Sequence, residues 1–99
     1  ILSLILELEE KVELCVENYL HFWNELLQDA PSLLRLSSLS SKVKELKVEV
    51  EAAFEGCNSI FPFTIQASTF YLSYLLTTNT SLEGYKRASS ILNKLSSED

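Results

Sequence analysis

The chain has 99 residues, of which 46% are hydrophobic, and its formal net charge at pH 7 is −6. This length suits one domain near the small end of the usual range, and two glycines and two prolines leave room for few turns. The negative charge argues against a nucleic-acid partner and against an anionic membrane surface, because both require a basic face on the protein. We therefore expect a single helical domain over residues 1–99, and a first residue other than Met suggests a piece of a longer chain.

The apolar run at the N-terminus does not predict insertion into a membrane. The run Ile1–Leu6 is interrupted by Ser3 and ends at Glu7, whereas a membrane-spanning helix needs about 20 apolar residues. The run also lacks the basic flank of a signal peptide. We therefore expect it to begin the first helix.

The first helix is expected from about residue 2 to residue 28. One set of its apolar residues recurs at alternating steps of four and three: Leu8, Val12, Cys15, Tyr19, Phe22 and Leu26. This spacing is typical of a helix seam that packs against a neighbouring helix. A second set widens the seam in the second half of the helix: Val16, Leu20, Trp23 and Leu27. We therefore expect that half to be buried on two sides.

A second helix is expected over residues 31–57, with Asp29 as its cap and Pro31 in its first turn. It carries the longest regular apolar seam of the chain: Leu36, Leu39, Val43, Leu46, Val50, Ala53 and Cys57. Four serines lie within residues 37–41, and short hydroxyl side chains compete for backbone hydrogen bonds. The sequence leaves open whether this segment bends the helix, and whether it is modified by phosphate.

The first two helices are expected to form an antiparallel hairpin, in which residue numbers at the same height sum to about 60. This register brings Glu13 level with Lys47, and Glu17 level with Lys42 and Lys44. The acidic face of the first helix then meets the lysines of the second, as at the e and g positions of a coiled coil. Exposed pairs contribute about 0.2–1 kcal/mol each, so they select the register more than they stabilise the fold.

The chain contains two cysteines, Cys15 and Cys57. The same register separates them by about 12 residues in height, or roughly 18 Å, whereas a disulfide needs Cα atoms within about 7 Å. We therefore expect two separate, reduced and buried thiols rather than a disulfide. Cys15 has only glutamates at helical spacing, which would raise its pKa, so we do not expect it to act as a nucleophile.

No charged residue occurs from Gly56 to Leu82, the stretch that contains the third expected helix, over residues 62–77, opened by Pro62. Its apolar stripe is wider than one neighbouring helix can cover: Ile65, Ala67, Phe70, Tyr71, Tyr74, Leu75 and Leu76. Two interpretations stay open. Either this helix is the central, best-buried one of the bundle, or part of it is an interface with a partner. The partner-binding residues are then predicted to be Phe63, Phe70, Leu72 and Leu76.

A fourth helix is expected over residues 81–96, because Thr80 and Glu83 form a capping-box pattern with Thr80 as N-cap. Gly84 weakens its first turn by about 1 kcal/mol relative to Ala, and a close approach of the third helix would explain the glycine. Its apolar side consists of Leu82, Tyr85, Ala88, Ile91 and Leu95. The four helices together predict an all-α fold of two antiparallel helical hairpins without strands.

No set of residues points to catalysis, a metal or a cofactor. The one histidine, His21, stands four residues from both Glu17 and Glu25. These three residues lie opposite the apolar seam with no second histidine or thiolate near, so we interpret them as a solvated face rather than a metal site. No acid, base and nucleophile converge, and no glycine-rich loop is present to bind phosphate. We therefore expect no enzymatic activity.

Several stretches together resemble a known family. The sequence LHFWNELLQDAPSL of residues 20–33 leads into a long helix at residues 42–54. A later helix at residues 67–76 is followed by the sequence LEGYKRA of residues 82–88. This pattern looks like the TPR-like helical segment of large protist multi-pass membrane proteins that also carry PAS or nucleotide-cyclase domains, the TmcB/TmcC-type repeat family. The resemblance covers nearly the whole chain, and the second half also resembles a half-a-TPR (HAT) repeat.

The resemblance implies a cytoplasmic helical connector or scaffold without catalysis of its own. The prediction is therefore a non-catalytic interaction or connector module within a larger cytoplasmic signalling or membrane-anchored protein. The alternative is a structural subunit, or a self-associating bundle, that docks a partner helix through the third helix. In both cases the partner is a protein, either a second copy of the chain or neighbouring helical repeats.

Overall fold

A computed structural model describes residues 2–60, 64–78 and 81–98 of the chain. These residues form four α-helices: α1 (Leu2–Leu26), α2 (Leu33–Ile60), α3 (Ile65–Thr78) and α4 (Leu82–Glu98). No strand occurs in the described ranges, so the all-α prediction is confirmed, and every helix limit lies within three residues of its predicted place. The predicted opening of the third helix at Pro62 falls outside the described residues.

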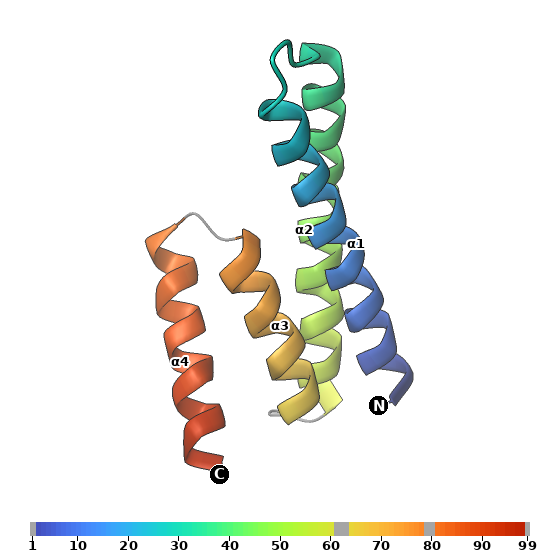
Figure 1. Ribbon diagram of the computed structural model, residues 1–99. Helices are drawn as coiled ribbons and strands as arrows, with labels where there is room; N and C mark the ends of the chain where they lie inside the picture. Colours follow the sequence, from blue (N-terminus) through green and yellow to red (C-terminus); the bar gives the residue numbers. More distant parts are fainter. Residues whose placement is uncertain (1, 61–63, 79–80, 99) are drawn as a thin grey trace.

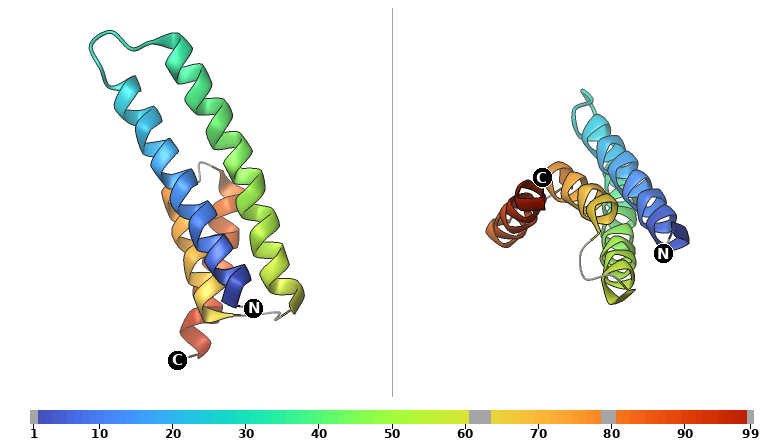
Figure 2. Two further views of the ribbon diagram at one scale, coloured as in Figure 1. Left: turned by 90° about the vertical axis from the view of Figure 1, so that its right-hand side faces the viewer. Right: turned by 90° about the horizontal axis from the view of Figure 1, so that it is seen from below.

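The helices pair into two antiparallel hairpins that stack side by side (Figure 1, Figure 2). In the first hairpin α1 packs against α2, and in the second α4 packs against α3. The hairpins are joined mainly where α1 packs against α3, so the first helices of the two pairs lie next to one another. The backbone of α3 approaches all three other helices, as expected for a central helix, whereas α4 lies at the outer edge.

The hydrophobic core consists mainly of the seam positions of the helical patterns. Its buried members are Ile5, Leu8, Val12, Cys15, Val43, Leu46, Val50, Phe54, Cys57, Ala67, Tyr71, Tyr74, Leu75, Ala88 and Ile91. Its aromatic centre is the pair Phe54 and Tyr71, whose rings stack with centroids 3.9 Å apart. Burial of these seams drives the folding of the helices, because short helices are marginal in water without tertiary packing.

The second half of α1 is not buried on two sides, contrary to the prediction. The side chains of Leu20, Trp23 and Leu27 are 53%, 41% and 76% exposed. The reason is helix length, because α1 has 25 residues and α2 has 28, whereas α3 has only 14. Figure 1 shows that the first hairpin extends past the end of α3. The difference of 11 residues between α1 and α3 corresponds to roughly 16 Å at about 1.5 Å per residue.

Serine side chains cap two of the helices. The Ser32 hydroxyl accepts a 3.2 Å hydrogen bond from the Arg35 backbone N–H, so Ser32 is the N-cap of α2 and the prediction of Asp29 was wrong. The Ser81 hydroxyl accepts a 3.2 Å bond from the Gly84 N–H in the same way and caps α4. The predicted capping role of Thr80 falls outside the described residues. The serine-rich segment leaves α2 continuous from residue 33 to residue 60.

The antiparallel register of the first hairpin is confirmed. The Lys11 Nζ lies 2.9 Å from the Glu49 carboxylate, and the Arg35 Nε lies 2.9 Å from the Glu25 carboxylate. The residue numbers of each pair sum to 60, as the register requires. Lys11 is the one lysine of α1, and its bond to Glu49 raises its pKa above the ordinary value.

The particular ion pairs predicted for Lys47 and for Glu13 and Glu17 do not form among the described residues. Lys47 instead donates a 3.1 Å hydrogen bond to the Thr78 carbonyl, the last carbonyl of α3. The reason is that Lys47 lies on the side of α2 where α3 ends. A helix leaves its last carbonyls without intrahelical partners, and a lysine near the C-terminus satisfies one of them.

Cys15 and Cys57 are free and buried, as predicted. Burial raises the pKa of both thiols. The nearby Lys47 opposes this rise at Cys15, and Glu7 adds to it at Cys57. The prediction for Cys15 was therefore right in direction, but the cause is desolvation of the thiol rather than neighbouring glutamates.

Candidate functional site

An open groove of about 450 Å³ runs between α1 and α3. Its apolar lining consists of Val12, Val16, Leu20 and Phe70. The three residues of α1 share one face because they are four apart in a helix, and Phe70 faces them from α3. The groove is therefore built by the first helices of the two hairpins.

A row of carboxylates borders the same groove. Glu9, Glu13 and Glu17 follow one another at steps of four along α1. Among the described residues, neither Glu9 nor Glu13 has a cation within ion-pair distance, and Glu17 has only the exposed ring of His21 at 3.6 Å. The groove thus combines apolar walls with uncompensated negative charge, and its complement is an apolar side chain flanked by cations.

The structure separates the residues predicted from the sequence to bind a partner. Phe70 is half-buried in the groove, and Leu72, two residues on, points to nearly the opposite side of α3 and packs against the core. Leu76 is 64% exposed, on the same side of α3 as the exposed Ile65. Phe63 falls outside the described residues.

A polar cluster that the sequence did not reveal ties α4 to the first hairpin. The fully buried Tyr71 donates its hydroxyl to the two carboxylate oxygens of Glu51, at 2.7 and 2.8 Å. The Arg87 guanidinium of α4 lies 3.4 Å from the same carboxylate and 4.9 Å from the centre of the Tyr71 ring. Burial raises the pKa of Tyr71 well above its ordinary range, and the hydrogen bond to Glu51 raises it further. One carboxylate on α2 thus holds a residue of α3 and a residue of α4.

Three aromatic residues cluster in the uncovered second half of α1. The rings of Tyr19 and Phe22 each meet the ring of Trp23 edge to face, with centroids 6.2 Å apart in both pairs. Tyr19 and Phe22 also line a second cavity, of about 180 Å³, together with four residues of α2: Ser40, Val43, Lys44 and Lys47. This cavity lies where the first hairpin extends past the end of α3, because Lys47 also contacts the last carbonyl of α3.

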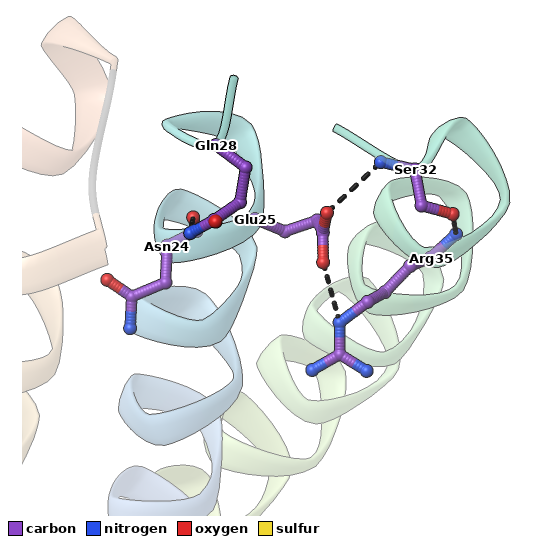
Figure 3. Close-up of polar contacts among 5 residues, drawn as sticks. All are labelled: Asn24, Glu25, Gln28, Ser32 and Arg35. Carbon is purple, nitrogen blue, oxygen red and sulfur yellow. Dashed lines mark hydrogen bonds and ion pairs between the residues drawn. The ribbon is translucent and has the colours of Figure 1, made fainter. Parts of the chain in front are cut away.

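The tip of the first hairpin is held by one carboxylate, as Figure 3 shows. Glu25 accepts a 3.0 Å hydrogen bond from the backbone N–H of Ser32 and a 2.9 Å bond from Arg35. Where the chain leaves α1, the Gln28 side chain donates to the carbonyl of Asn24 at 2.9 Å. The turn therefore links the end of α1 to the start of α2 by specific contacts.

The described residues contain no group of three His, Cys, Asp or Glu side chains arranged to hold a metal ion. Of the three residues considered from the sequence, His21 and Glu17 are exposed, and Glu25 turns away to Arg35. No helix in the described ranges is both long and apolar enough to cross a membrane.

The glutamate row of α1 was visible in the sequence, since its spacing of four places it on one helix face, but its role beside a groove depends on where α3 lies. The cluster of Glu51, Tyr71 and Arg87 had no signal at all in the sequence. Its members come from three different helices, and only the packing of α3 and α4 against α2 brings them together.

Two stacked antiparallel helical hairpins, joined through their first helices, define the chain as a helical-repeat protein. A family model described as TmcB, TPR repeats matches residues 3–97, and the chain belongs to this family. No curated protein and no solved structure gives a significant match. The family places the chain among helical modules of the kind that mediate protein–protein interactions.

Proposed function

We propose that the chain is a non-catalytic interaction or connector module within a larger cytoplasmic signalling or membrane-anchored protein. Membership in the TmcB family of TPR repeats supports a role in protein–protein contact. The observation that carries the proposal is the groove between α1 and α3, because it offers about 450 Å³ of open, partly apolar space. An open apolar groove bordered by glutamates is a surface that a protein partner with apolar and basic side chains would complement.

The groove fits a basic amphipathic segment of a partner protein. Apolar side chains of the segment would contact Val16, Leu20 and Phe70, and flanking lysines or arginines would meet Glu13 and its neighbours on α1. Charge complementarity of this kind contributes mainly to the association rate and to specificity. Binding is therefore expected to weaken as the ionic strength rises.

The test uses a synthetic helical peptide of about 15 residues, with leucines at helical spacing and lysines on both flanks. Titration calorimetry should show saturable binding to the wild type. Glu13→Lys should weaken binding at least about fivefold and should make the affinity less dependent on ionic strength. Phe70→Ala should weaken binding but leave its dependence on ionic strength unchanged. Glu45→Lys is the matched control, because Glu45 is exposed on α2 and does not line the groove. Equal effects of Glu13→Lys and Glu45→Lys would contradict the proposal.

A second candidate function is self-association through α3. The observation in its favour is the outer side of α3, where Ile65 and Leu76 are 56% and 64% exposed. If two copies pack there, sedimentation velocity will show a dimer that Leu76→Glu dissociates while the helical content is unchanged. A monomer at all concentrations would exclude this candidate and leave the peptide groove as the proposal.

A further inference from the structure

The strongest feature that the proposed function leaves unused is the continuation of the α1 seam past α3. The lower part of this seam is covered by α2 and α3, and Leu8 and Val12 are 0% and 6% exposed there. Further along the same helix, the seam residue Leu26 is 40% exposed, and Trp23 of the second apolar set is 41% exposed. The chemistry of the seam does not change between the two parts. What changes is that α3 ends at Thr78 while α1 and α2 continue (Figure 1).

The packing of α3 on the first half of α1 indicates what kind of element fits the uncovered second half. In Figure 1 and Figure 2, α3 lies along α1 and α2, and the first hairpin extends beyond its end in the same direction. The uncovered length is roughly 16 Å, which accommodates about three turns of a second helix placed end to end with α3. Three aromatic rings line this length, and buried aromatic residues are the commonest anchors of protein interfaces.

The charges around this surface select the partner. Lys44 and Lys47 line the cavity from the α2 side, and Lys44 has no ion pair among the described residues. No carboxylate lines the cavity. Glu25, which lies further toward the end of α1, pairs with Arg35 (Figure 3). The charged residues that line this cavity are therefore both cations, although the chain as a whole carries −6.

We propose that the uncovered end of the α1–α2 hairpin docks an acidic amphipathic helix of another protein. We define this surface, the distal face, by Tyr19, Phe22, Trp23 and Leu26 of α1 and by Val43 and Lys44 of α2. The docked helix presents an apolar stripe to the aromatic rings and carboxylates to Lys44. It continues the interface that α3 makes with the lower half of the hairpin, and the cavity beside it shares no lining residue with the acidic groove.

The distal face is organised before a partner arrives. The bonds from Ser32 and Arg35 to Glu25 fix the turn, and the edge-to-face contacts of Trp23 hold the three rings in place. A surface that is already ordered loses less conformational entropy on binding. The distal face therefore needs no refolding to accept a helix of about three turns.

The test uses the only tryptophan of the chain, which lies in the distal face, so its fluorescence reports directly on coverage. The probe is a synthetic peptide of about 15 residues with leucines at helical spacing and glutamates on one flank. Titration of the peptide should shift the emission of Trp23 to shorter wavelength in a saturable way, because the half-exposed indole becomes covered. The same peptide with lysines in place of the glutamates should bind this face at least about fivefold more weakly, measured in the Glu13→Lys variant, whose groove binds basic peptides poorly.

Two charge reversals on α2 serve as variant and control. Lys44→Glu should weaken binding of the acidic peptide at least about fivefold. Lys42→Glu changes the charge equally on the same helix, but Lys42 is exposed and does not line the cavity, so it should leave the affinity within about twofold. Leu26→Ser should also weaken binding, through the apolar contact. Circular dichroism of each variant should match the wild type, since all three side chains are exposed.

The proposal would be overturned by no shift with the acidic peptide, by an equal shift with the basic peptide in the Glu13→Lys variant, or by equal losses from Lys44→Glu and Lys42→Glu. A shift to shorter wavelength on concentrating the protein alone would also overturn it, because a second copy would then be the occupant. Failure here is distinguishable from failure of the proposed function, since Glu13→Lys should weaken binding of the basic peptide to the groove and should leave binding of the acidic peptide unchanged.

Discussion

Replacement of Tyr71 by Phe tests the polar cluster that joins three helices. Tyr71→Phe removes one hydroxyl and keeps the ring, so the 3.9 Å stack on Phe54 is retained. The hydroxyl donates at 2.7 and 2.8 Å to the two oxygens of Glu51. Hydrogen bonds to charged groups contribute about 1.5–3 kcal/mol to stability. The Glu51 side chain is 35% exposed and keeps its contact with Arg87, so we expect the lower end, a loss of about 1–2 kcal/mol.

The assay is urea unfolding followed by circular dichroism and by the fluorescence of Trp23. The two signals should give one transition if the chain unfolds as a unit, since the first reports all four helices and the second reports the first hairpin. Tyr85→Phe is the control, because Tyr85 is 63% exposed on α4 and its hydroxyl makes no hydrogen bond among the described residues. A difference between wild type and Tyr71→Phe below about 0.5 kcal/mol would refute the energetic role of the hydroxyl.

The pH dependence gives a second check on the same side chain. Burial and the bond to Glu51 raise the pKa of Tyr71 in the folded state above the value of about 10 for an unfolded chain. The folded state then holds this proton more tightly, so the contribution is fully present below pH 10 and is lost as pH rises further. The stability gap between wild type and Tyr71→Phe should therefore narrow above about pH 10. A gap that stays constant to pH 11 would mean that the tyrosine does not titrate as its burial requires.

Three further predictions concern helix propensity and burial. Gly56→Ala should stabilise the protein by about 0.5–1 kcal/mol, measured by urea unfolding, because Gly56 lies within α2 and a Cβ there has no atom within 4 Å. Leu72→Glu should destabilise the fold by more than about 2 kcal/mol, whereas Leu76→Glu should stay within about 0.5 kcal/mol, because only Leu72 packs against the core. Cys15 and Cys57 should react with Ellman's reagent only after unfolding, since burial raises the pKa of both thiols; fast reaction of the native protein would contradict their buried positions.

The sequence determined the helices and the register of the first hairpin. The apolar seams at steps of three and four predict the core residues of α1 and α2. The ion pairs Lys11–Glu49 and Arg35–Glu25 confirm the predicted register of the two helices. Both features depend on neighbours along the chain or on one short turn. They are therefore encoded in periodicity and in the order of polar and apolar residues.

Only the tertiary structure decided which parts of those seams are covered. The same periodicity runs through both halves of α1, yet Cys15 is buried and Trp23 is half-exposed, because α3 is 14 residues long and ends beside the middle of the hairpin. The place where α3 ends also directs Lys47 to the Thr78 carbonyl and not to a glutamate of α1. The helical period identifies the side of a helix that packs against a neighbour. How much of that side is buried depends on the length and position of a helix that is distant in sequence.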